Sequence, residues 1–287
     1  PCKGKEGAAR MDHIGLIASD MDYTLLDENG QLPGGFAELV RALEEEGIYF
    51  AAASGRPLYT LEAMFPDLRQ HIALIGDNGG AIRWRGRDIY QSRMPAADYR
   101  EMAAATREAG DVGVLCGMES AYVERQYERY ARVLGQFYTR VTYVDDLTAL
   151  DVPADKYTIY LPRGDSQAAY DKRYGKLYAG RFSVAVAGPN WVDIMNRGVD
   201  KGAALRALGR SLGLERASLM AFGDTYNDAE MLCCAKYGFL MANGSRDLRA
   251  RVAFLAPPHW DQGVMRIMRQ VLAQSGWVEP SDFTPAH

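Results

Sequence analysis

The sequence predicts an α/β fold in which a parallel-sheet core is interrupted by an inserted α+β domain. Short apolar runs that fit buried strands alternate with segments whose apolar residues recur at helical spacing, a pattern typical of a parallel sheet. This rhythm changes at about residue 93 and returns after Pro189. The 287 residues also exceed one ordinary domain of about 100 to 150 residues. The expected parts are a core over 11–92 and 189–275, an insertion over 93–188, and tails at 1–10 and 276–287.

The first part of the core is predicted from βα units. Residues 14–19 form a short apolar run, and the next apolar positions, over 36–43, have helical spacing. A second strand is predicted over 49–53, and it leads into a helix opened by Pro57, because proline fits the first helical turn. A third strand is predicted over 72–76, and a hairpin follows it. Its strands are expected at 81–84 and 88–91, with the turn at Arg85 and Gly86.

The insertion and the second part of the core follow from the same kind of pattern. A Tyr-rich helix and strands over 157–161 and 182–187 are expected in the insertion. After it, Leu205, Leu208 and Leu212 share one helix face. The remaining predictions are strands over 219–222 and 238–241, a helix from Asn227, a helix capped by Ser245 and an amphipathic helix over 264–272.

Composition excludes several classes of protein. The 33 basic and 37 acidic residues give a net charge of −4, which disfavours nucleic acid as a partner. No apolar run approaches the roughly 18 residues of a membrane span, so we expect no membrane partner. The four cysteines lack CxxC spacing, which indicates reduced thiols and a cytoplasmic location. Residues 1–10 contain no hydrophobic segment and are expected to be neither signal peptide nor anchor. Oligomeric state cannot be predicted.

Polar residues follow three of the predicted core strands. Asp20 and Asp22 come after the first, Ser54 after the second, and Asp224 after the strand near Phe222. The carboxyl ends of parallel strands meet at one edge of a sheet, where ligands bind. Carboxylates brought together there repel one another unless a cation or a shared proton stabilises them, and a divalent metal is the natural candidate. Together with Asp228 they form an oxygen-only set that suits Mg²⁺.

An anion site is predicted beside these carboxylates. Ser54 and the backbone N–H groups after it lie at a helix N-terminus, a position that suits phosphate oxygens, and Lys201 adds a positive point charge. The segments Asp20-Met-Asp22-Tyr-Thr24, Ser54-Gly55-Arg56, Lys201 and Gly223-Asp224-xx-Asn227-Asp228 resemble, in order and location, the four motifs of the haloacid dehalogenase (HAD) superfamily. The insertion, with Gly76-Asp-Asn78-Gly-Gly-Ala-Ile before it, resembles the Cof-type sugar-phosphatase branch with its type IIB cap.

The resemblance implies a Rossmann-like core, an α+β cap and a HAD-type phosphoric monoester hydrolase that acts on a small phosphorylated metabolite, specifically a sugar phosphate. It implies that Asp20 forms an aspartyl-phosphate and that Asp22 is the general acid and base. By similarity, Mg²⁺ binds Asp20, the Asp22 carbonyl and Asp224, and Asp228 supports it. Lys201 neutralises charge, and the residues that contact the phosphoryl group are Ser54, Gly55 and Asn227. Tyr23 stands where that branch usually has glycine, a difference that bears on the turn or the space beside Asp20.

Other interpretations fit parts of the sequence. A phosphomutase shares the same nucleophile and acid, and a silent metabolite-binding protein would keep the site without turnover. Tyrosines interleaved with arginines over 122–143 could suggest stacking on nucleic acid, but Tyr127, Tyr130 and Leu134 have the helical spacing of a packed face. Asp193 is expected to be either a substrate contact or a turn residue.

Overall fold

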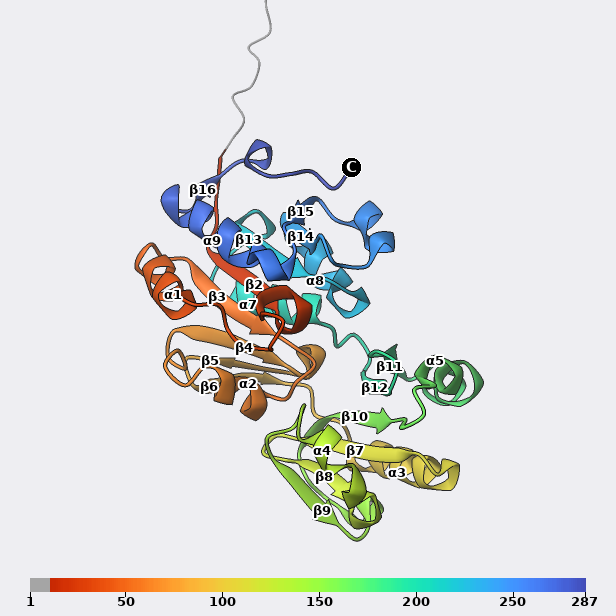
Figure 1. The fold of residues 1–287 in the computed structure, drawn as a ribbon. Helices are drawn as coiled ribbons and strands as arrows, with labels where there is room; N and C mark the ends of the chain where they lie inside the picture. The colour runs from red at the N-terminus through yellow and green to blue at the C-terminus, as the bar shows by residue number, and fades with distance from the viewer. Residues whose placement is uncertain (1–10) are drawn as a thin grey trace, which may run out of the picture. The chain divides into compact units, whose positions relative to one another are not determined.

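The structure, a computed structural model, describes residues 11–287, so the expected tail at 1–10 lies outside the described residues. The described chain forms two compact units. The first combines the residues up to Ala52 with Leu205–His287, and the second is Ala53–Ala204. Figure 1 shows the helices and strands of both units.

A parallel sheet forms the centre of the first unit. Its strands lie in the order β15-β14-β13-β2-β3. Ala221 in β13 pairs with Ala18 on one side and with Gly238 on the other, so β13 and β2 are adjacent central strands. Both are fully buried, as expected for a parallel sheet covered on two faces. The bounds are β2 Leu16–Asp20, β3 Tyr49–Ala53, β13 Leu219–Gly223, β14 Tyr237–Met241 and β15 Phe254–Ala256.

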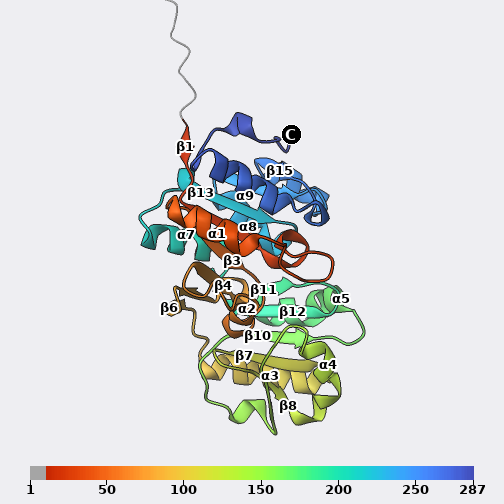
Figure 2. The ribbon, with the colours of Figure 1, turned by 60° about the vertical axis from the view of Figure 1, so that its left-hand side comes forward.

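Amphipathic helices pack on this sheet. Helix α1 (Phe36–Glu45) buries the predicted apolar face at Phe36, Leu39, Val40 and Leu43. It packs beside α9 (Gly263–Ala273), and Figure 2 shows the two helices side by side. Helix α8 (Ala229–Cys234) packs on β13 and β14. Helix α7 (Lys201–Ser211) begins in the second unit and enters the first at Leu205.

The C-terminal residues, expected as a tail from 276, are part of the first unit's structure. Strand β16 (Trp277–Val278) pairs with β1 (Asp12–His13) in an antiparallel two-stranded sheet. Phe283 is buried, and its ring packs edge-on against Phe239 and Phe254. These residues therefore contribute to the core of this unit.

The second unit begins with the segment after β3. Helix α2 (Leu58–Met64) starts directly after Pro57, as predicted. Strands β4 (Ile72–Gly76), β5 (Ala81–Trp84) and β6 (Arg87–Gln91) form an antiparallel meander. The predicted hairpin turn is confirmed, since Arg85 and Gly86 both have positive φ angles, of 48° and 73°.

A six-stranded sheet forms the rest of the second unit, with the order β11-β12-β10-β7-β8-β9. One of its faces packs on α3 (Ala96–Ala109) and on the helical run from α5 (Ser166–Ala169) to α6 (Gly175–Tyr178). The strand bounds are β7 Val112–Gly117, β8 Ala121–Glu124, β9 Val141–Val144, β10 Ala154–Tyr160, β11 Phe182–Val186 and β12 Trp191–Asn196. Strand β12 carries this sheet to Asn196, beyond the expected end of the insertion at 188.

Two predicted helices differ from the structure. The Tyr-rich segment is a 3₁₀ helix over Arg125–Tyr130 that continues into the short helix α4 (Ala131–Leu134). Its packed face is confirmed, because Tyr127 and Leu134 are buried in one core cluster and Tyr130 packs against that cluster. The prediction of a helix capped by Ser245 is wrong. The Ser245 side chain makes no cap hydrogen bond, and the Arg246–Arg251 segment that follows is a 3₁₀ helix. Across residues 11–287, no helix has both the length and the apolar character needed to cross a membrane.

Candidate active site

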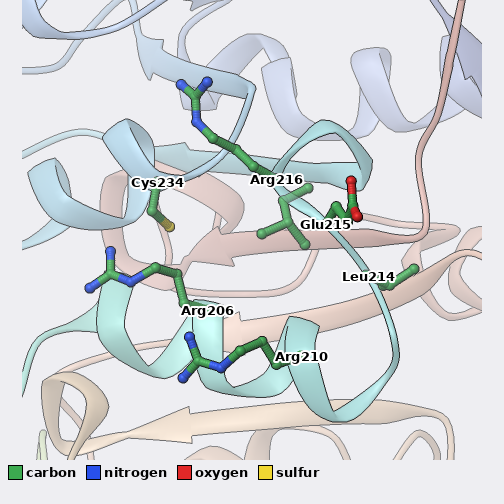
Figure 3. Close-up of a pocket in the computed structure, with 7 residues that line it drawn as sticks. Arg206, Arg210, Leu214, Glu215, Arg216 and Cys234 are labelled. Carbon is green, nitrogen blue, oxygen red and sulfur yellow. The ribbon is translucent and has the colours of Figure 1, made fainter.

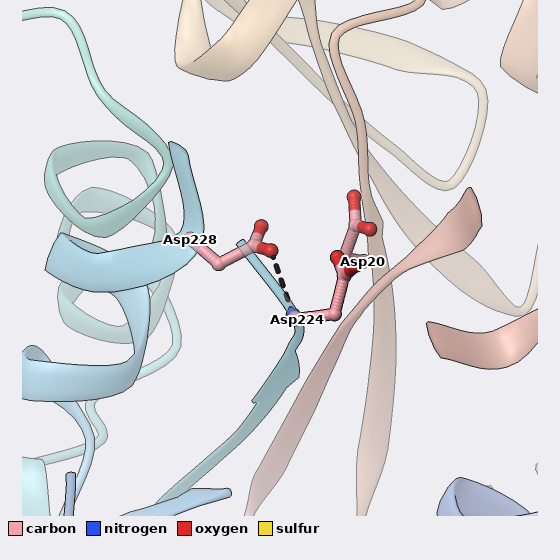
Figure 4. A group of neighbouring side chains, drawn as sticks. All are labelled: Asp20, Asp224 and Asp228. Atoms are coloured by element: carbon pink, nitrogen blue, oxygen red, sulfur yellow. Dashed lines mark hydrogen bonds between the residues drawn. The ribbon is translucent and has the colours of Figure 1, made fainter. Parts of the chain in front are cut away.

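Three aspartates from two distant parts of the sequence converge in the first unit. Asp20 ends β2, Asp224 directly follows β13, and Asp228 ends the short 3₁₀ turn Tyr226–Asp228. One carboxylate oxygen from each lies within 4.8 Å of the other two, as Figure 4 shows. Asp20 and Asp228 are buried, and Asp224 is half-buried. The adjacent parallel strands thus place these side chains at one sheet edge, as their strand-end positions predict.

Asp228 holds the loop that carries Asp224. Its Oδ2 atom accepts hydrogen bonds from the backbone N–H groups of Asp224, at 3.0 Å, and Thr225, at 3.1 Å. Thr225 and Asp228 also form a reciprocal capping box at the start of the 3₁₀ turn. Gly223 allows this packing, because a Cβ atom there would lie 2.4 Å from the Asp228 Cβ. Asn227 lies in the same turn, half-buried.

The donor chemistry of this acidic cluster fits a hard divalent cation. Carboxylates this close repel one another strongly in a partly buried site, and a bound cation removes that repulsion. Asp20, Asp224 and Asp228 offer only oxygen donors, which Mg²⁺ prefers, whereas zinc sites usually include histidine or cysteine. Among residues 11–287, these three aspartates form the one group of carboxylate, histidine or cysteine side chains with this spacing.

Asp22 and Tyr23 lie in the tight turn after Asp20. The Leu26 N–H donates to the Met21 carbonyl across this turn at 3.0 Å. Asp22 is half-buried and has an extended backbone, and its side chain is outside the three-aspartate group. Tyr23 has φ 60° and ψ 10°, in the left-handed region that favours glycine. The departure from glycine that the sequence shows at Tyr23 therefore falls at a position where a side chain strains the backbone.

The Tyr23 ring lies at the surface of the first unit and is not part of its core. Its side chain is 66% exposed and packs edge-on against His259, with the ring centroids 5.8 Å apart. The Asn243 side-chain amide donates a hydrogen bond to the Tyr23 carbonyl at 2.9 Å, and this bond holds the turn in place. The strained turn is thus held by its neighbours in the same unit.

The serine motif lies in the second unit, at the end of β3. Ser54 is buried, and its Oγ accepts a hydrogen bond from the Arg56 N–H at 3.1 Å. The Ser54 and Arg56 carbonyls accept from the backbone N–H groups of Asn78 and Asp77, both at 2.9 Å. Asp77 and Asn78 reach these carbonyls because both have positive φ angles, of 49° and 54°, which Asp and Asn tolerate better than most residues.

Lys201 is fully buried at the first position of α7, in the second unit. Asp200 precedes it and caps the helix, since its Oδ1 accepts from the Ala203 N–H at 2.6 Å. Gly79 (φ 103°) packs against this helix start, and a Cβ there would lie 2.3 Å from the Asp200 carbonyl oxygen. A fully buried lysine requires compensating negative charge, so Lys201 is not a solvated surface residue.

A second buried lysine was missed by the sequence analysis. Lys156 is 2% exposed, and its Nζ lies 3.0 Å from Asp77 Oδ1 and 3.5 Å from Asp193 Oδ2. Burial alone would lower the pKa of Lys156, but Asp193 and Asp77 outweigh it and hold that pKa well above its usual value. Asp193 lies inside β12 and is therefore not a turn residue. The charge of Lys156 is balanced by Asp77 and Asp193, which are distant in sequence, so the local sequence carries no signal for it.

A surface cavity in the first unit lies away from the acidic cluster. Leu219, the first residue of β13, lines it, whereas Asp224 follows the opposite end of that strand. Figure 3 shows its lining residues, and the arginine side chains do not converge on one point. The seven lining residues are Arg206, Arg210, Leu214, Glu215, Arg216, Leu219 and Cys234. This cavity contains none of the predicted site residues.

The fold and the acidic cluster together define a class of protein. HAD-type hydrolases have a parallel-sheet core with aspartates at its strand ends. An α+β cap domain is inserted in the chain of this core. A family model described as haloacid dehalogenase-like hydrolase matches residues 17–268. The chain belongs to this family and is a phosphoric monoester hydrolase of its phosphatase type.

Relatives and solved structures agree with this assignment. The chain is 28% identical over 263 residues to "5-amino-6-(5-phospho-D-ribitylamino)uracil phosphatase YbjI" of Escherichia coli K12, covering 90% of this chain and 96% of that protein. It is 28% identical over 250 residues to "HMP-PP phosphatase" of Cronobacter sakazakii, covering 84% and 88%. The crystal structure of SMU.1108c from Streptococcus mutans matches with a TM-score of 0.81 and 27% identity, over 91% of this chain and 99% of that chain.

Proposed function

We propose that this phosphatase hydrolyses a sugar phosphate in an Mg²⁺-dependent reaction that passes through an aspartyl-phosphate on Asp20. The observation that carries the proposal is the convergence of Asp20, Asp224 and Asp228 at the carboxyl ends of two adjacent strands. Asp22 follows two residues after Asp20, in the tight turn. Asp20 is then available for attack, Asp22 for proton transfer, and Asp20, Asp224 and Asp228 for cation binding.

The reaction is proposed in two steps. An Asp20 carboxylate oxygen attacks phosphorus while the bond from phosphorus to the leaving oxygen breaks, and Asp22 gives its proton to that oxygen. In the second step Asp22 takes a proton from water, which attacks the same phosphorus and displaces the Asp20 carboxylate. The products are the dephosphorylated metabolite and inorganic phosphate, and both aspartates return to their starting states.

Other residues bind and neutralise the phosphoryl group in this proposal. Asp20, the Asp22 carbonyl and Asp224 would hold Mg²⁺, with support from Asp228. When bound, the cation would neutralise charge on the carboxylates and on the phosphoryl oxygens. From their motif positions, Ser54, the Gly55 N–H and Asn227 hydrogen-bond the phosphoryl group, and Lys201 neutralises its negative charge.

The proposed substrate class follows from the resemblance to the Cof-type branch and from the relatives' names. One relative is named for a phospho-D-ribitylamino compound and another as "Phosphoglycolate phosphatase". Both names describe a phosphate ester of a small molecule, and the ribityl chain in the first name also carries hydroxyl groups. A sugar phosphate shares both of these features with the first compound.

The test is phosphate release from sugar phosphates, nucleotides, a phosphorylated ribitylaminouracil and a generic aryl phosphate, with Mg²⁺ and with EDTA. We expect metal-dependent release that is fastest with a sugar or sugar-alcohol phosphate. Equal release with EDTA would contradict the metal proposal, and preference for nucleotides would contradict the substrate class. Interconversion of two sugar phosphates without phosphate release would show a phosphomutase instead.

A further inference from the structure

We propose that Lys156 is a positioning residue for the Ser54 hydroxyl and acts on it through the peptide group between Gly55 and Arg56. The inference rests on the proposed function in one respect, namely that Ser54 binds the phosphoryl group. Lys156 belongs to β10 of the six-stranded sheet, about one hundred residues from the serine motif in sequence. All of the residues involved belong to the second unit.

A chain of two hydrogen bonds leads from Lys156 to Ser54. The Lys156 Nζ donates to the Gly55 carbonyl at 2.6 Å. The N–H of the same peptide group belongs to Arg56, and it donates to Ser54 Oγ at 3.1 Å. Because a trans peptide is planar, with its C=O and N–H pointing in opposite directions, fixing the carbonyl fixes the direction of the N–H. A charged donor on the carbonyl also polarises the peptide and strengthens the second bond.

These two hydrogen bonds determine the direction in which the Ser54 hydroxyl can donate. A hydroxyl has one hydrogen to donate and two lone pairs to accept with. Since Ser54 Oγ already accepts from the Arg56 N–H, its own hydrogen turns away from that N–H and is directed to an acceptor elsewhere. A phosphoryl oxygen is such an acceptor. Lys156 would therefore preset the Ser54 hydroxyl as a donor before the phosphate binds.

The strand places Lys156 for this contact. Between Ala154 and Lys156 the pairing of β10 with β7 shifts register, and Lys156 then pairs with Cys116. In the regular part that follows, Thr158 pairs with Asp193 of β12. Side chains two residues apart on a strand share a face, so Lys156, Thr158 and Asp193 all project from the same face of the sheet.

Polar neighbours then fix the lysine side chain. Asp193 accepts from the Thr158 hydroxyl at 2.8 Å and from the Asn78 amide at 2.9 Å, so this carboxylate is held in place while it faces Lys156. Asp77 adds the closer ion pair, at 3.0 Å. A buried lysine with its carboxylate partners is rarely the most stabilising arrangement, because apolar side chains of similar size often stabilise the fold as well or better. A role in positioning accounts for keeping a charged donor at this point.

The test is a double-mutant cycle on the binding of inorganic phosphate, measured by calorimetry with Mg²⁺ present. Lys156→Met/Asp77→Asn removes the lysine together with its nearest buried carboxylate, so that no unpaired charge is created at Asp77. We expect this variant and Ser54→Ala each to weaken phosphate binding about tenfold. The protein that combines these substitutions should also bind phosphate about tenfold, rather than a hundredfold, more weakly, because both changes interrupt the same two linked hydrogen bonds. Lys176→Met, at an exposed lysine of the same unit, should leave phosphate binding unchanged.

The other outcomes overturn the inference in distinguishable ways. A folded lysine variant that binds phosphate within about twofold of the wild type, while Ser54→Ala does not, contradicts the positioning role alone. Effects that multiply in the combined variant show that Lys156 acts independently of Ser54. If Ser54→Ala leaves phosphate binding intact, the Ser54 role in the proposed function fails as well. Should the lysine variant not fold, the cycle is run with Asp193→Asn, which should weaken binding about threefold and only when Ser54 is present.

Discussion

The Oδ2 atom of Asp228 accepts a hydrogen bond from the backbone N–H of Asp224 at a distance of 3.0 Å. Asp228 therefore has two effects in the acidic cluster. It holds the loop that presents Asp224, and it adds a negative charge close to Asp20 and Asp224. The first effect needs only an acceptor oxygen, whereas the second needs the charge, so two substitutions can separate them.

We predict that Asp228→Ala lowers the free energy of unfolding by about 1 to 2 kcal/mol in EDTA, because a buried cap acceptor is lost. Asp228→Asn should stay close to the wild type in EDTA, since an amide oxygen can accept the same bonds and the carboxylate repulsion falls. With Mg²⁺, the melting temperature of the wild type should rise through ligand binding, and that of Asp228→Asn should rise less. Thermal unfolding with and without the metal measures all of these effects.

Glu38→Gln is the matched control for the Asp228 pair, because Glu38 is an exposed acid in α1 of the same unit. It should change neither stability nor the response to Mg²⁺. An Asp228→Ala variant as stable as the wild type would show that the carboxylate does not hold the loop. An Asp228→Asn variant with the full Mg²⁺ response would show that the charge of Asp228 does not support the cation.

The left-handed backbone of Tyr23 predicts an unusual order of stability. Tyr23→Ala and Tyr23→Gly both remove the exposed ring, but only alanine keeps a Cβ at φ 60°. We expect Tyr23→Ala to be less stable than Tyr23→Gly by about 1 kcal/mol in urea unfolding. The same pair at Glu38, within a helix, should show the reverse order, with glycine less stable. Equal stabilities of the two Tyr23 variants would refute the strain.

Asp155 predicts a pH-dependent stability. Burial raises the pKa of the Asp155 carboxyl well above its usual value, and nearby Asp77 raises it further. The folded state then keeps a proton that the unfolded state releases near pH 4, so stability is lost as pH rises from there through the folded pKa. Asp155→Asn removes this dependence. Relative to the wild type, its free energy of unfolding should increase by at least about 1 kcal/mol between pH 5 and pH 8.

Urea titrations at several pH values test the Asp155 prediction. Asp151→Asn, at an exposed aspartate four residues earlier, is the control and should show no such trend. A constant difference between Asp155→Asn and the wild type across this range would mean that the Asp155 carboxyl titrates alike in the folded and unfolded states.

The acidic cluster could be predicted from the sequence because strand ends carry the information. Asp20 and Asp224 each follow an apolar run, and parallel pairing brings such ends together whatever their separation in sequence. The Arg85–Gly86 hairpin was predictable for a similarly local reason, since Gly86 lies between two strand-like runs and readily takes the positive φ that the turn needs. The strain at Tyr23 was indicated only by comparison with the glycine of the related motif.

Features that depend on tertiary contacts could not be predicted. Lys156 lies in a strand with an irregular pairing, and only the packing of Asp77 and Asp193 shows that its charge is buried. The Ser245 cap failed because a suitable residue type does not ensure the hydrogen bond. Strand β12 was hard to assign because Asp193 interrupts its apolar run, and the charge is accommodated by Thr158 and Asn78 from other segments.

Whether Asp20 is the nucleophile is tested most directly by comparing phosphate release by the wild type and by Asp20→Asn on the best substrate of the panel, with saturating Mg²⁺. Circular dichroism and thermal unfolding confirm that both proteins are folded. We expect Asp20→Asn to lose activity by at least about a thousandfold while it keeps its fold, since an amide cannot form the aspartyl-phosphate. Mg²⁺-dependent release at an undiminished rate by the folded variant would show that Asp20 is not the nucleophile.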